Sequence, residues 1–443
     1  MNKFADDIKV VKFGGSSLAD AEHFSKVKYI IEKDPKRKYV IPSAPGRRFD
    51  KDEKVTDLLY ECYSNAESIG NIDEIFQKVI SRYESILQDL KLDLDLTEEF
   101  QHIKWSILHH AGRDYAASRG EYLNGLILSR YLGFDFVDPA KCIKFFDNGT
   151  FDSELTNELL GKELIKHDTA VIPGFYGSMP NGTIKTFSRG GSDITGSLVS
   201  RAVLAEIYEN WTDVDGFLLA DPRIVKNPKR MNFVTYRELR ELSYMGAGVL
   251  HEDSIFPVRF AGIPINIRNT NDPENPGTMI VSQTDVYDTE NVITGIAGRK
   301  GFSIITIEKA MMNSEQGFGR KVLEAIEKEN ISFEHLPSGI DTMSVIIRTD
   351  ALSPCKEKLK DRICQLVEPD YISIEDGLAL IAVVGRSMVK TKGTAFRIFK
   401  SVAEAEINIR MIDQGSSELN IIIGVDEKDF ELATNAIYKE FIK

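Results

Sequence analysis

A stretch with the chemistry of an anion-binding site runs from residue 187 to residue 203 and reads FSRGGSDITGSLVSRAV. Arg189 can hold a carboxylate or a phosphate through two parallel hydrogen bonds, and Asp193 can orient a metal ion or an ammonium group. The glycines let backbone N–H groups approach an anion, and the helix predicted to follow adds the positive end of its dipole. A glycine-rich turn with a helix N-cap at Ser192 explains the same residues about equally well, so both interpretations stay open.

A second glycine pair follows Lys12, in the segment KFGGSS that ends the first predicted strand. Amide donors from Gly14 and Gly15, together with the charge of Lys12, suit a phosphate cradle. The order differs from a Walker A loop, in which the lysine follows the glycines. A tight strand-to-helix turn with a solvated lysine explains this segment about as well.

Glu121 stands next to a glycine inside a predicted helix, in the sequence SRGE (118–121). Glycine costs about 1 kcal/mol of helix propensity at such a position, which indicates a packing or ligand-approach reason. Glu121 is therefore a candidate for binding a cationic amine, although a solvated glutamate on a helix surface is the commoner case.

Hydroxyl and carboxylate groups follow another predicted strand, in the segment ENWTDVDGFLLADPR (209–223). Thr212, Asp213 and Asp215 come just after the strand, and Asp221 and Arg223 fall in the turn that follows. The acidic and hydroxyl groups after the strand could hold a ribose, or Mg²⁺ through water. For this segment taken alone, an Asp-Gly turn and a proline-containing loop are the preferred interpretation.

The residues that other reaction classes need are not arranged for them. The seven histidines have no metal-ligand spacing with acidic or cysteine partners, and there is no G-x-S-x-G elbow. A kinase that phosphorylates a carboxylate needs no histidine, because its nucleophile is already ionised at pH 7. Its difficulty is to bring two anions together, and lysine, arginine, amide donors and Mg²⁺ meet that difficulty. The inventory therefore favours phosphoryl transfer.

The whole chain has the composition of an ordinary globular protein, and 443 residues predict about two to four domains. A net charge of −13 argues against nucleic acid as a main partner. The four cysteines show neither framework spacing nor C-x-x-C pairs, which predicts reduced thiols. No apolar run reaches about 18 residues and the first residues contain no signal-peptide core, so we expect a cytoplasmic protein without membrane contact.

Strand and helix patterns alternate over the first half of the chain. Short apolar runs at 8–13 and 38–43 predict buried strands, and helical patterns follow near 51–69, 71–91 and 96–132. This alternation predicts a mainly parallel sheet covered by helices on both faces. Strand ends followed by glycine should meet at one edge of that sheet, where such folds bind ligands.

The pattern changes after the turn-rich segment 269–278. A βαββαβ-like pattern appears twice, at a spacing of about 75 residues, and indicates an internal duplication. We therefore divide the chain into a first domain over 1–285 and two smaller units over 286–370 and 371–443. Each unit is small for independent stability, which predicts paired packing and a homodimer or dimer of dimers.

Taken together, these segments resemble the aspartate kinases, members of the amino-acid-kinase superfamily, over essentially the whole chain. The matching segments occur in the family's order: KFGGSS, SAPG with VTDLL, SRGE, GFYGS, NGTIKTFSRGGSD, TDVDGFLLADPR, ELSYMGAGVLH and QGSSELNI. The resemblance implies a three-layer αβα amino-acid-kinase fold with a mainly parallel sheet, followed by two ferredoxin-like (βαββαβ) ACT units.

The resemblance also implies the reaction. The γ-phosphoryl group of ATP, with Mg²⁺, would pass to the β-carboxylate of L-aspartate and give 4-phospho-L-aspartate, the first step toward lysine, threonine and methionine. Feedback by an end-product amino acid, lysine or threonine with lysine preferred, would act through the ACT units.

Each matching residue receives an implied role, with Glu121 on the α-ammonium group of aspartate and Arg189 on a carboxylate. The residues implied in catalysis are Lys12, Arg189 and Asp193. Those implied around aspartate are Ser43, Ala44, Thr56, Glu121, Phe175, Arg189 and Ser192. Those implied around the nucleotide are Lys12, Gly14, Gly15, Ser16, Thr212, Asp213, Leu218, Asp221 and Arg223. Those implied near the effector are Met312, Phe318, Gly339 and Asp341. No residue is assigned as a metal ligand.

Three positions depart from the family pattern. Gly248 stands where many members have a lysine, Glu252 replaces a common proline, and Leu218 stands where an aromatic residue often packs near the adenine. Two alternatives therefore remain beside an aspartate kinase. One is a related kinase for glutamate, N-acetylglutamate, carbamate or a nucleoside monophosphate, and the other is an amino-acid sensor without phosphotransfer. The pairing of Glu121 with Arg189 favours a zwitterionic amino acid as substrate.

Overall fold

The structure is a computed structural model that describes residues 7–68, 70–188, 190–247, 252–282 and 292–442, with the side chains of 252–254 left aside. Its internal contacts divide the chain into two compact units. The described parts of the first unit are 7–68, 70–188, 190–217, 232–236 and 252–282, and those of the second are 218–231, 237–247 and 292–442. Each unit is considered by itself.

The first unit is built on an eight-stranded sheet in which strand pairs are parallel except for β9 with β10. In sheet order the strands are β3 (Asp135–Phe136), β4 (Ala170–Val171), β2 (Arg37–Pro42), β1 (Lys9–Phe13), β7 (Ile207–Thr212), β9 (Ile265–Asn269), β10 (Thr278–Val281) and β8 (Phe233–Thr235). A separate hairpin consists of β5 (Tyr176–Ser178) and β6 (Ile184–Thr186).

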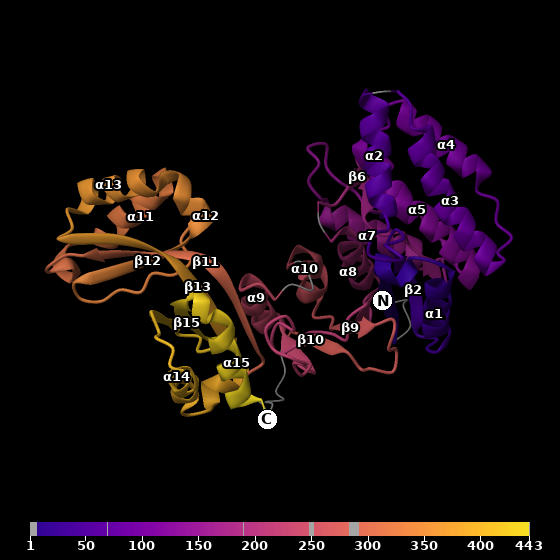
Figure 1. Cartoon of the computed structure of the whole chain (residues 1–443). Coiled ribbons are helices and arrows are strands. Elements are labelled where there is room, and N and C mark those ends of the chain that lie inside the picture. Colours follow the sequence, from indigo (N-terminus) through magenta and orange to yellow (C-terminus); the bar gives the residue numbers. More distant parts are fainter. Residues whose placement is uncertain (1–6, 69, 189, 248–251, 283–291, 443) are drawn as a thin grey trace. The chain divides into compact units, whose positions relative to one another are not determined.

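Helices cover both faces of this sheet (Figure 1). One face carries α1 (Ala21–Glu32), α2 (Val55–Ser68), α3 (Asp73–Leu90), α4 (Thr97–Leu108) and α5 (Arg113–Leu132). Their apolar side chains form one core with Val11, Phe13 and Trp211 of the central strands. The other face carries α8 (Gly191–Val203), with α7 (Ser153–Leu164) and α10 (Glu252–Ala261) packed against it. Short helices α6 (Pro139–Cys142) and η1 (Gly15–Leu18) lie in the connections.

The second unit contains a five-stranded antiparallel sheet in the order β12-β11-β13-β15-β14. Its strands are β11 (Gly295–Glu308), β12 (Thr342–Arg348), β13 (Tyr371–Val384), β14 (Met411–Asp413) and β15 (Asn420–Asp426). Helix α9 (Tyr236–Tyr244) begins in the first unit and continues in the second. The other helices of the second unit are α11 (Phe318–Lys328), α12 (Thr349–Leu352), α13 (Lys356–Val367), α14 (Thr394–Glu404) and α15 (Phe430–Phe441). Its short 3-10 turns are η2 (Met312–Ser314), η3 (Ser353–Cys355), η4 (Arg386–Lys390) and η5 (Glu427–Asp429).

Two long strands run through both halves of this sheet. Residues 295–299 of β11 pair with the end of β13, whereas residues 302–308 pair with its beginning and with β12. Gly301 and Gly377, with φ values of 91° and 83°, adopt the left-handed conformation that glycine tolerates where the pairing shifts. One ferredoxin-like half is therefore inserted between the strands of the other. The predicted fold class is confirmed, while the divisions at 285 and 370 remain predictions.

Residues 218–231 precede the second sheet in sequence but are hydrogen-bonded to strand β11 of that sheet and to helix α15. The Ile296 N–H donates to the Leu219 carbonyl at 2.7 Å, and the Lys229 N–H donates to the Tyr438 hydroxyl at 2.8 Å. Several of the residues predicted around the nucleotide thus belong to the second unit.

Some predicted elements differ from the structure. The helical pattern at 96–132 forms two helices, because the chain turns at Gly112, which has a φ of 94°. Residues 331–338, which fall in the first copy of the repeated βαββαβ-like pattern, make only single bridges, His335 with Ile346 and Ser338 with Met343. Apolar periodicity marked both segments correctly as ordered but did not locate the break or the pairing.

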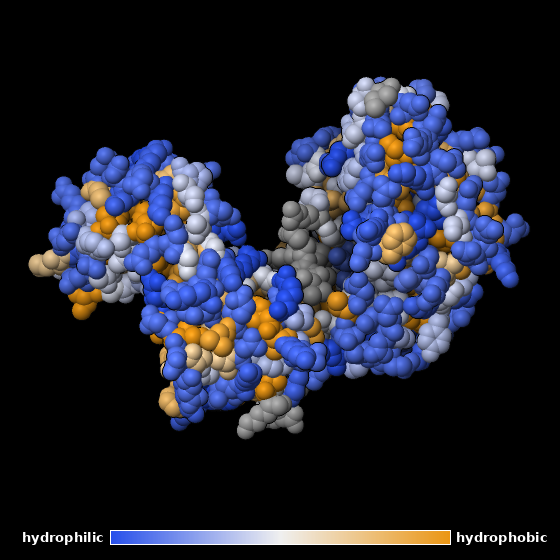
Figure 2. All heavy atoms as spheres, in the orientation of Figure 1, coloured by the Kyte–Doolittle hydropathy of each residue, from blue (hydrophilic) through white to orange (hydrophobic). Residues whose placement is uncertain are grey.

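Polar and charged side chains dominate the face of the molecule seen in Figure 2, with apolar side chains in small separate areas. Within the described residues, none of the helices combines the length and the apolar character needed to span a bilayer.

Candidate active site

A cavity of about 220 Å³ lies in the first unit, beyond the carboxyl ends of the central strands. It is lined by Lys12, Ser43, Thr56, Glu121, Phe175, Gly190, Gly191, Ser192 and Asp193. All of these except the two glycines are residues predicted above. They come from separate places along the chain, namely β1, the loop after β2, helices α2 and α5, the loop after β4, and the start of α8. Parallel strands bring these segments to one edge because their carboxyl ends point the same way.

Close backbone packing sets the first turn of α8 at this cavity. A Cβ atom on Gly174 would lie 2.5 Å from Ser192 Oγ, and one on Gly191 would lie 2.4 Å from the Phe175 ring. Phe175 itself has a φ of 83°, in the left-handed region that a bulky residue rarely adopts. Its N–H donates to Thr195 Oγ1 at 3.1 Å, which helps to hold this conformation.

The helix begins two residues earlier than the alternative interpretation requires. Its N-cap is Gly190, with a φ of 58°, so the predicted N-cap at Ser192 is wrong. Glycine has no side chain to accept hydrogen bonds from the first-turn N–H groups. Those donors and the positive end of the helix dipole therefore suit an anion at the cavity.

Lys12 is buried at the cavity wall with a carboxylate and an amide as partners. Its Nζ lies 2.7 Å from Asp193 Oδ1 and donates to Asn210 Oδ1 at 3.4 Å. The Asn210 Nδ2 group in turn donates to the same Asp193 Oδ1 at 2.9 Å. Three polar side chains thus form a closed triangle, from strands β1 and β7 and helix α8.

Glu121 is a buried carboxylate that lacks a full set of partners. Its side chain lines the cavity, yet Oε2 has no hydrogen-bond partner among the described residues. Burial raises the pKa of Glu121 to about 8, although hydrogen bonding from the Ala44 backbone opposes the rise. The adjacent Gly120 lets α5 approach closely, because a Cβ atom there would lie 2.8 Å from Ala44 Cβ. The glycine in SRGE therefore has a packing reason.

The glycines of KFGGSS serve the packing of two loops. A Cβ atom on Gly15 would lie 2.8 Å from the Ala44 carbonyl oxygen, and the Gly46 N–H donates to the Gly15 carbonyl at 2.8 Å. The Gly14 N–H donates to the Trp211 carbonyl at 3.0 Å, so this predicted phosphate donor is already engaged. Ser16, predicted at the nucleotide, lies in the 3-10 turn η1.

The residues predicted around the nucleotide are divided between the two units. Thr212 ends β7 in the first unit, and its hydroxyl donates to Asp213 at 3.1 Å. Leu218, Asp221 and Arg223 belong to the second unit. Arg223 lies 2.6 Å from Asp221 and its hydrogen bonds lower the pKa of that carboxyl. The cavity in the first unit is thus lined mainly by residues predicted around aspartate, whereas the residues predicted around the nucleotide belong to both units.

Two predicted positions lie outside the described residues. They are Arg189, expected to hold a substrate carboxylate, and Gly248, the departure from the family lysine. Glu252 begins α10.

The predicted effector residues come together in the second unit. Met312 and Phe318 are buried in the core beneath α11 and β12. Asp341 accepts a hydrogen bond from the Met311 N–H at 2.8 Å and ties this loop to the one before β12. The Gly339 N–H donates to the Thr342 carbonyl at 2.7 Å and closes that second loop.

Two asparagines at the site were not predicted. Asn210 belongs to the triangle, and Asn124 donates to the Ser43 carbonyl at 2.6 Å. Asn124 follows Glu121 by three residues on α5, so both lie on the same helix face. The signal for Asn210 was a buried strand that carries two successive polar residues, Glu209 and Asn210, between apolar ones.

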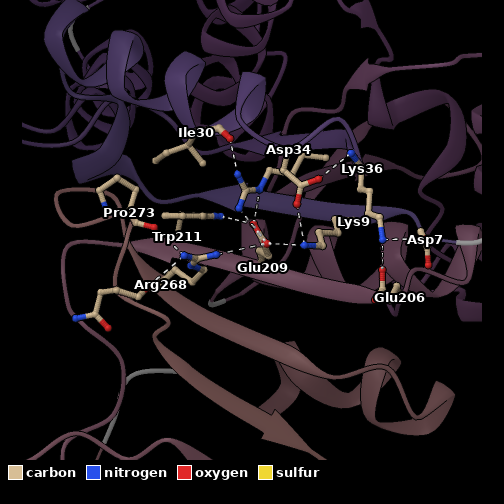
Figure 3. Close-up of polar contacts among 12 residues, drawn as sticks. Asp7, Lys9, Ile30, Asp34, Lys36, Glu206, Glu209, Trp211, Arg268 and Pro273 are labelled. Atoms are coloured by element: carbon tan, nitrogen blue, oxygen red, sulfur yellow. Dashed lines mark hydrogen bonds and ion pairs between the residues drawn. The ribbon is translucent and has the colours of Figure 1, made fainter.

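The opposite face of β7 carries a second group of buried charges, the Glu209 cluster, formed by Lys9, Arg37, Glu209, Trp211 and Arg268. Figure 3 shows Lys9, Trp211 and Arg268 around Glu209. Glu209 Oε2 accepts hydrogen bonds from Arg37 Nε and Trp211 Nε1, both at 2.8 Å. Arg37 Nη2 also donates to Oε1 at 3.2 Å, and Lys9 and Arg268 lie 3.8 and 3.9 Å from it. A cavity of about 230 Å³ adjoins the cluster.

Among the described residues, no three His, Cys, Asp or Glu side chains are grouped as metal ligands.

The sequence was compared with known proteins. Residues 7–269 match the amino acid kinase family, and residues 381–441 match an ACT domain. Aspartokinase 3 of Bacillus subtilis (strain 168) is 39% identical over 449 residues, which cover 98% of each chain. The crystal structure of the Clostridium acetobutylicum aspartate kinase is 51% identical, with a TM-score of 0.89 over 98% of this chain and 100% of that chain. E. coli aspartokinase III, solved with aspartate and ADP in its R-state, is 25% identical, with a TM-score of 0.72 over 98% of this chain and 100% of that one.

Proposed function

The chain belongs to the amino acid kinase family and, within it, to the aspartate kinases, and from this premise we propose that it makes 4-phospho-L-aspartate and ADP from L-aspartate and ATP. One observation carries the proposal. A small cavity is lined by a buried ammonium group, Lys12, and by a buried carboxylate, Glu121, of which one oxygen has no partner in the described chain. An amino acid with an acidic side chain has the complementary charges.

Glu121 is the group that we assign to the α-ammonium of the substrate. Its Oε2 gains an ion pair when that ammonium enters, and a charge-assisted hydrogen bond contributes about 1.5–3 kcal/mol. Ser43 and Thr56 line the same cavity and offer hydroxyl groups to the substrate. The E. coli relative was solved in complex with aspartate and ADP, which supports the same substrate for this chain.

The phosphoryl transfer needs no general base. A β-carboxylate oxygen of aspartate attacks the γ-phosphorus of ATP, and the bond from that phosphorus to the bridging oxygen breaks, leaving its electron pair on ADP. Lys12 and the first-turn N–H groups of α8 lie where they reduce the repulsion between the two anions. Lys12 and Asp193 are thus the described residues that we place in the catalytic machinery.

We expect Mg²⁺ to accompany ATP. Mg²⁺ keeps several water ligands and binds phosphate oxygens with few protein carboxylates, which fits a cavity without a grouped set of metal ligands in the described chain. When bound, the ion neutralises charge on the phosphates. Thr212 and Asp213, at the end of β7, are the described first-unit side chains that we assign to the nucleotide.

We further propose that the second unit binds an end-product amino acid, with lysine as the first candidate, and that the chain forms a homodimer or a dimer of dimers. Met312 and Asp341 lie in two loops that hydrogen bonds join, which supports a ligand site there. Titration with lysine, threonine and methionine, singly and in pairs, should show inhibition by lysine. Asp341→Ala should shift that inhibition curve without changing the uninhibited rate, and superimposable curves would misplace the site.

A coupled ADP-release assay with hydroxylamine tests the reaction itself. Aspartate should give a hydroxamate in step with ADP, because hydroxylamine traps acyl phosphates. Equal or faster turnover with glutamate would overturn the choice of substrate. Amino-acid binding by calorimetry without any ATP turnover in Mg²⁺ would instead indicate a sensor.

A further inference from the structure

We propose that Asn210 is a positioning residue for phosphoryl transfer, which holds Asp193 so that Lys12 can turn from that carboxylate to the phosphates. The inference rests on the function proposed above. In the proposed reaction Asn210 contacts neither aspartate nor the nucleotide and acts through Lys12 and Asp193.

The backbone places Asn210 beside Lys12. The two residues are direct partners across the parallel pair of β1 and β7, so their separation is set by the sheet and not by flexible side chains. Asn210 is only 3% exposed, which excludes water as an easy substitute for its partners. An amide can donate and accept at once, and here it accepts from Lys12 and donates to Asp193.

Tyr208, which lies on the same face of β7 as Asn210, holds helix α8, which carries Asp193. The Tyr208 hydroxyl donates to the Asp193 carbonyl at 3.3 Å. Gly196 makes room for that ring, since a Cβ atom there would lie 2.4 Å from the Tyr208 hydroxyl. Residues 208 and 210 share a face because side chains alternate along a strand. Asp193 is thus held from β7 both by its backbone and by its side chain.

The triangle explains how Lys12 can leave its partner. A buried carboxylate that loses its cation becomes an uncompensated charge, and that loss is costly. Asp193 Oδ1 keeps the Asn210 Nδ2 donor when the ammonium turns away, so the cost of redirecting Lys12 falls. The remaining Asn210 oxygen still limits where the ammonium can move. Displacement of a catalytic group by about 1 Å can lower a rate about 100-fold, so this control matters to the rate.

Asn210→Leu keeps the size of the side chain and removes both hydrogen bonds. We expect kcat to fall between about 10-fold and 100-fold, with the KM for aspartate within about twofold of wild type. Asn266→Leu is the matched control, because Asn266 is a buried asparagine on the neighbouring strand β9 that does not line the cavity. Its Oδ1 has no hydrogen-bond partner among the described residues, so this variant replaces a buried asparagine by leucine and should leave kcat near wild type.

Asn210→Asp gives a second readout that folding alone would not move. The new carboxylate faces Asp193 and Lys12, and two close carboxylates raise the pKa of one of them. A shared proton at lower pH would restore a donor between them, so the kcat of this variant should rise toward wild type as the pH falls. If Asn210→Leu does not fold, the dependence of kcat on pH in Asn210→Asp tests the proposed role of Asn210.

Two results would overturn the inference: a kcat of Asn210→Leu within twofold of wild type, or a loss of kcat that Asn266→Leu reproduces. A pH profile of Asn210→Asp parallel to that of wild type would do the same. Failure of the proposed function looks different, since the wild-type enzyme itself would then give no hydroxamate from aspartate.

Discussion

The two faces of strand β7 carry buried charged groups that differ in their proposed roles. On one face, Asn210 joins Lys12 and Asp193 beside a cavity of about 220 Å³. On the other, Glu209 and Trp211 join the Glu209 cluster beside a cavity of about 230 Å³. The two sites therefore differ little in the volume of their cavities, in the burial of their polar side chains or in the presence of charged groups.

The difference lies in which polar atoms have partners. Both oxygens of Glu209 have donors or cations at 2.8–3.9 Å. Glu121, at the other cavity, keeps one oxygen without a partner among the described residues. A satisfied buried cluster stabilises the fold, whereas an unsatisfied buried carboxylate costs stability until a ligand arrives. The comparison therefore distinguishes a structural charge from a binding charge.

The largest effect is expected from Glu209→Gln. It leaves Arg37 and its neighbouring cations without a buried counter-charge, and we expect the free energy of unfolding to fall by about 3–5 kcal/mol. Urea denaturation measures the change. Glu206→Gln, at a more exposed glutamate just before β7, is the control and should alter stability little. A KM for aspartate that rises with Glu209→Gln would break the comparison.

Lys12→Ala tests the other face and should lower kcat by about 10²–10³-fold, because it removes a fixed cation that opposes charge repulsion in the transition state. Lys9→Met, on the same strand, removes the ion pair with Asp34 and should leave kcat near wild type. Initial rates at saturating aspartate and ATP give the comparison. Wild-type turnover by Lys12→Ala would remove this residue from catalysis.

Glu121→Gln should raise the KM for aspartate by about 10- to 100-fold, since the neutral amide loses a charge-assisted bond to the substrate ammonium. Its thermal stability should not fall, because the substitution removes a buried carboxylate whose Oε2 has no partner among the described residues. Glu99→Gln, a glutamate on α4 outside the cavity, serves as the control. An unchanged KM would class Glu121 with the structural charges.

The smallest effect is a pH dependence of aspartate binding. Burial raises the pKa of Glu121 to about 8, so below that pH the carboxyl is mostly neutral in the free enzyme. Binding of an ammonium favours the ionised form, and the KM for aspartate should rise by up to about tenfold per unit as the pH falls below 8. Above pH 8 the KM should level off. The profile of Glu121→Gln, measured over the same range, should be flat.

The sequence alone determined the chemistry and the fold class. Lys12, Glu121 and Asp193 stand in segments whose glycines and strand ends are local signals, and those residues do meet at one cavity. Strand–helix alternation was enough for a parallel sheet, and a parallel sheet brings strand ends to one edge. These properties depend on short stretches of chain, which a sequence displays directly.

Only the tertiary structure decided which partners the polar atoms have. The N–H of Gly14 donates to the Trp211 carbonyl, Asn210 completes a triangle with Lys12, and the long strands β11 and β13 pair through both ferredoxin-like halves. Each of these outcomes pairs residues far apart in sequence. Periodicity and turn chemistry act over a few residues, whereas strand register and loop packing are set by contacts across the whole unit.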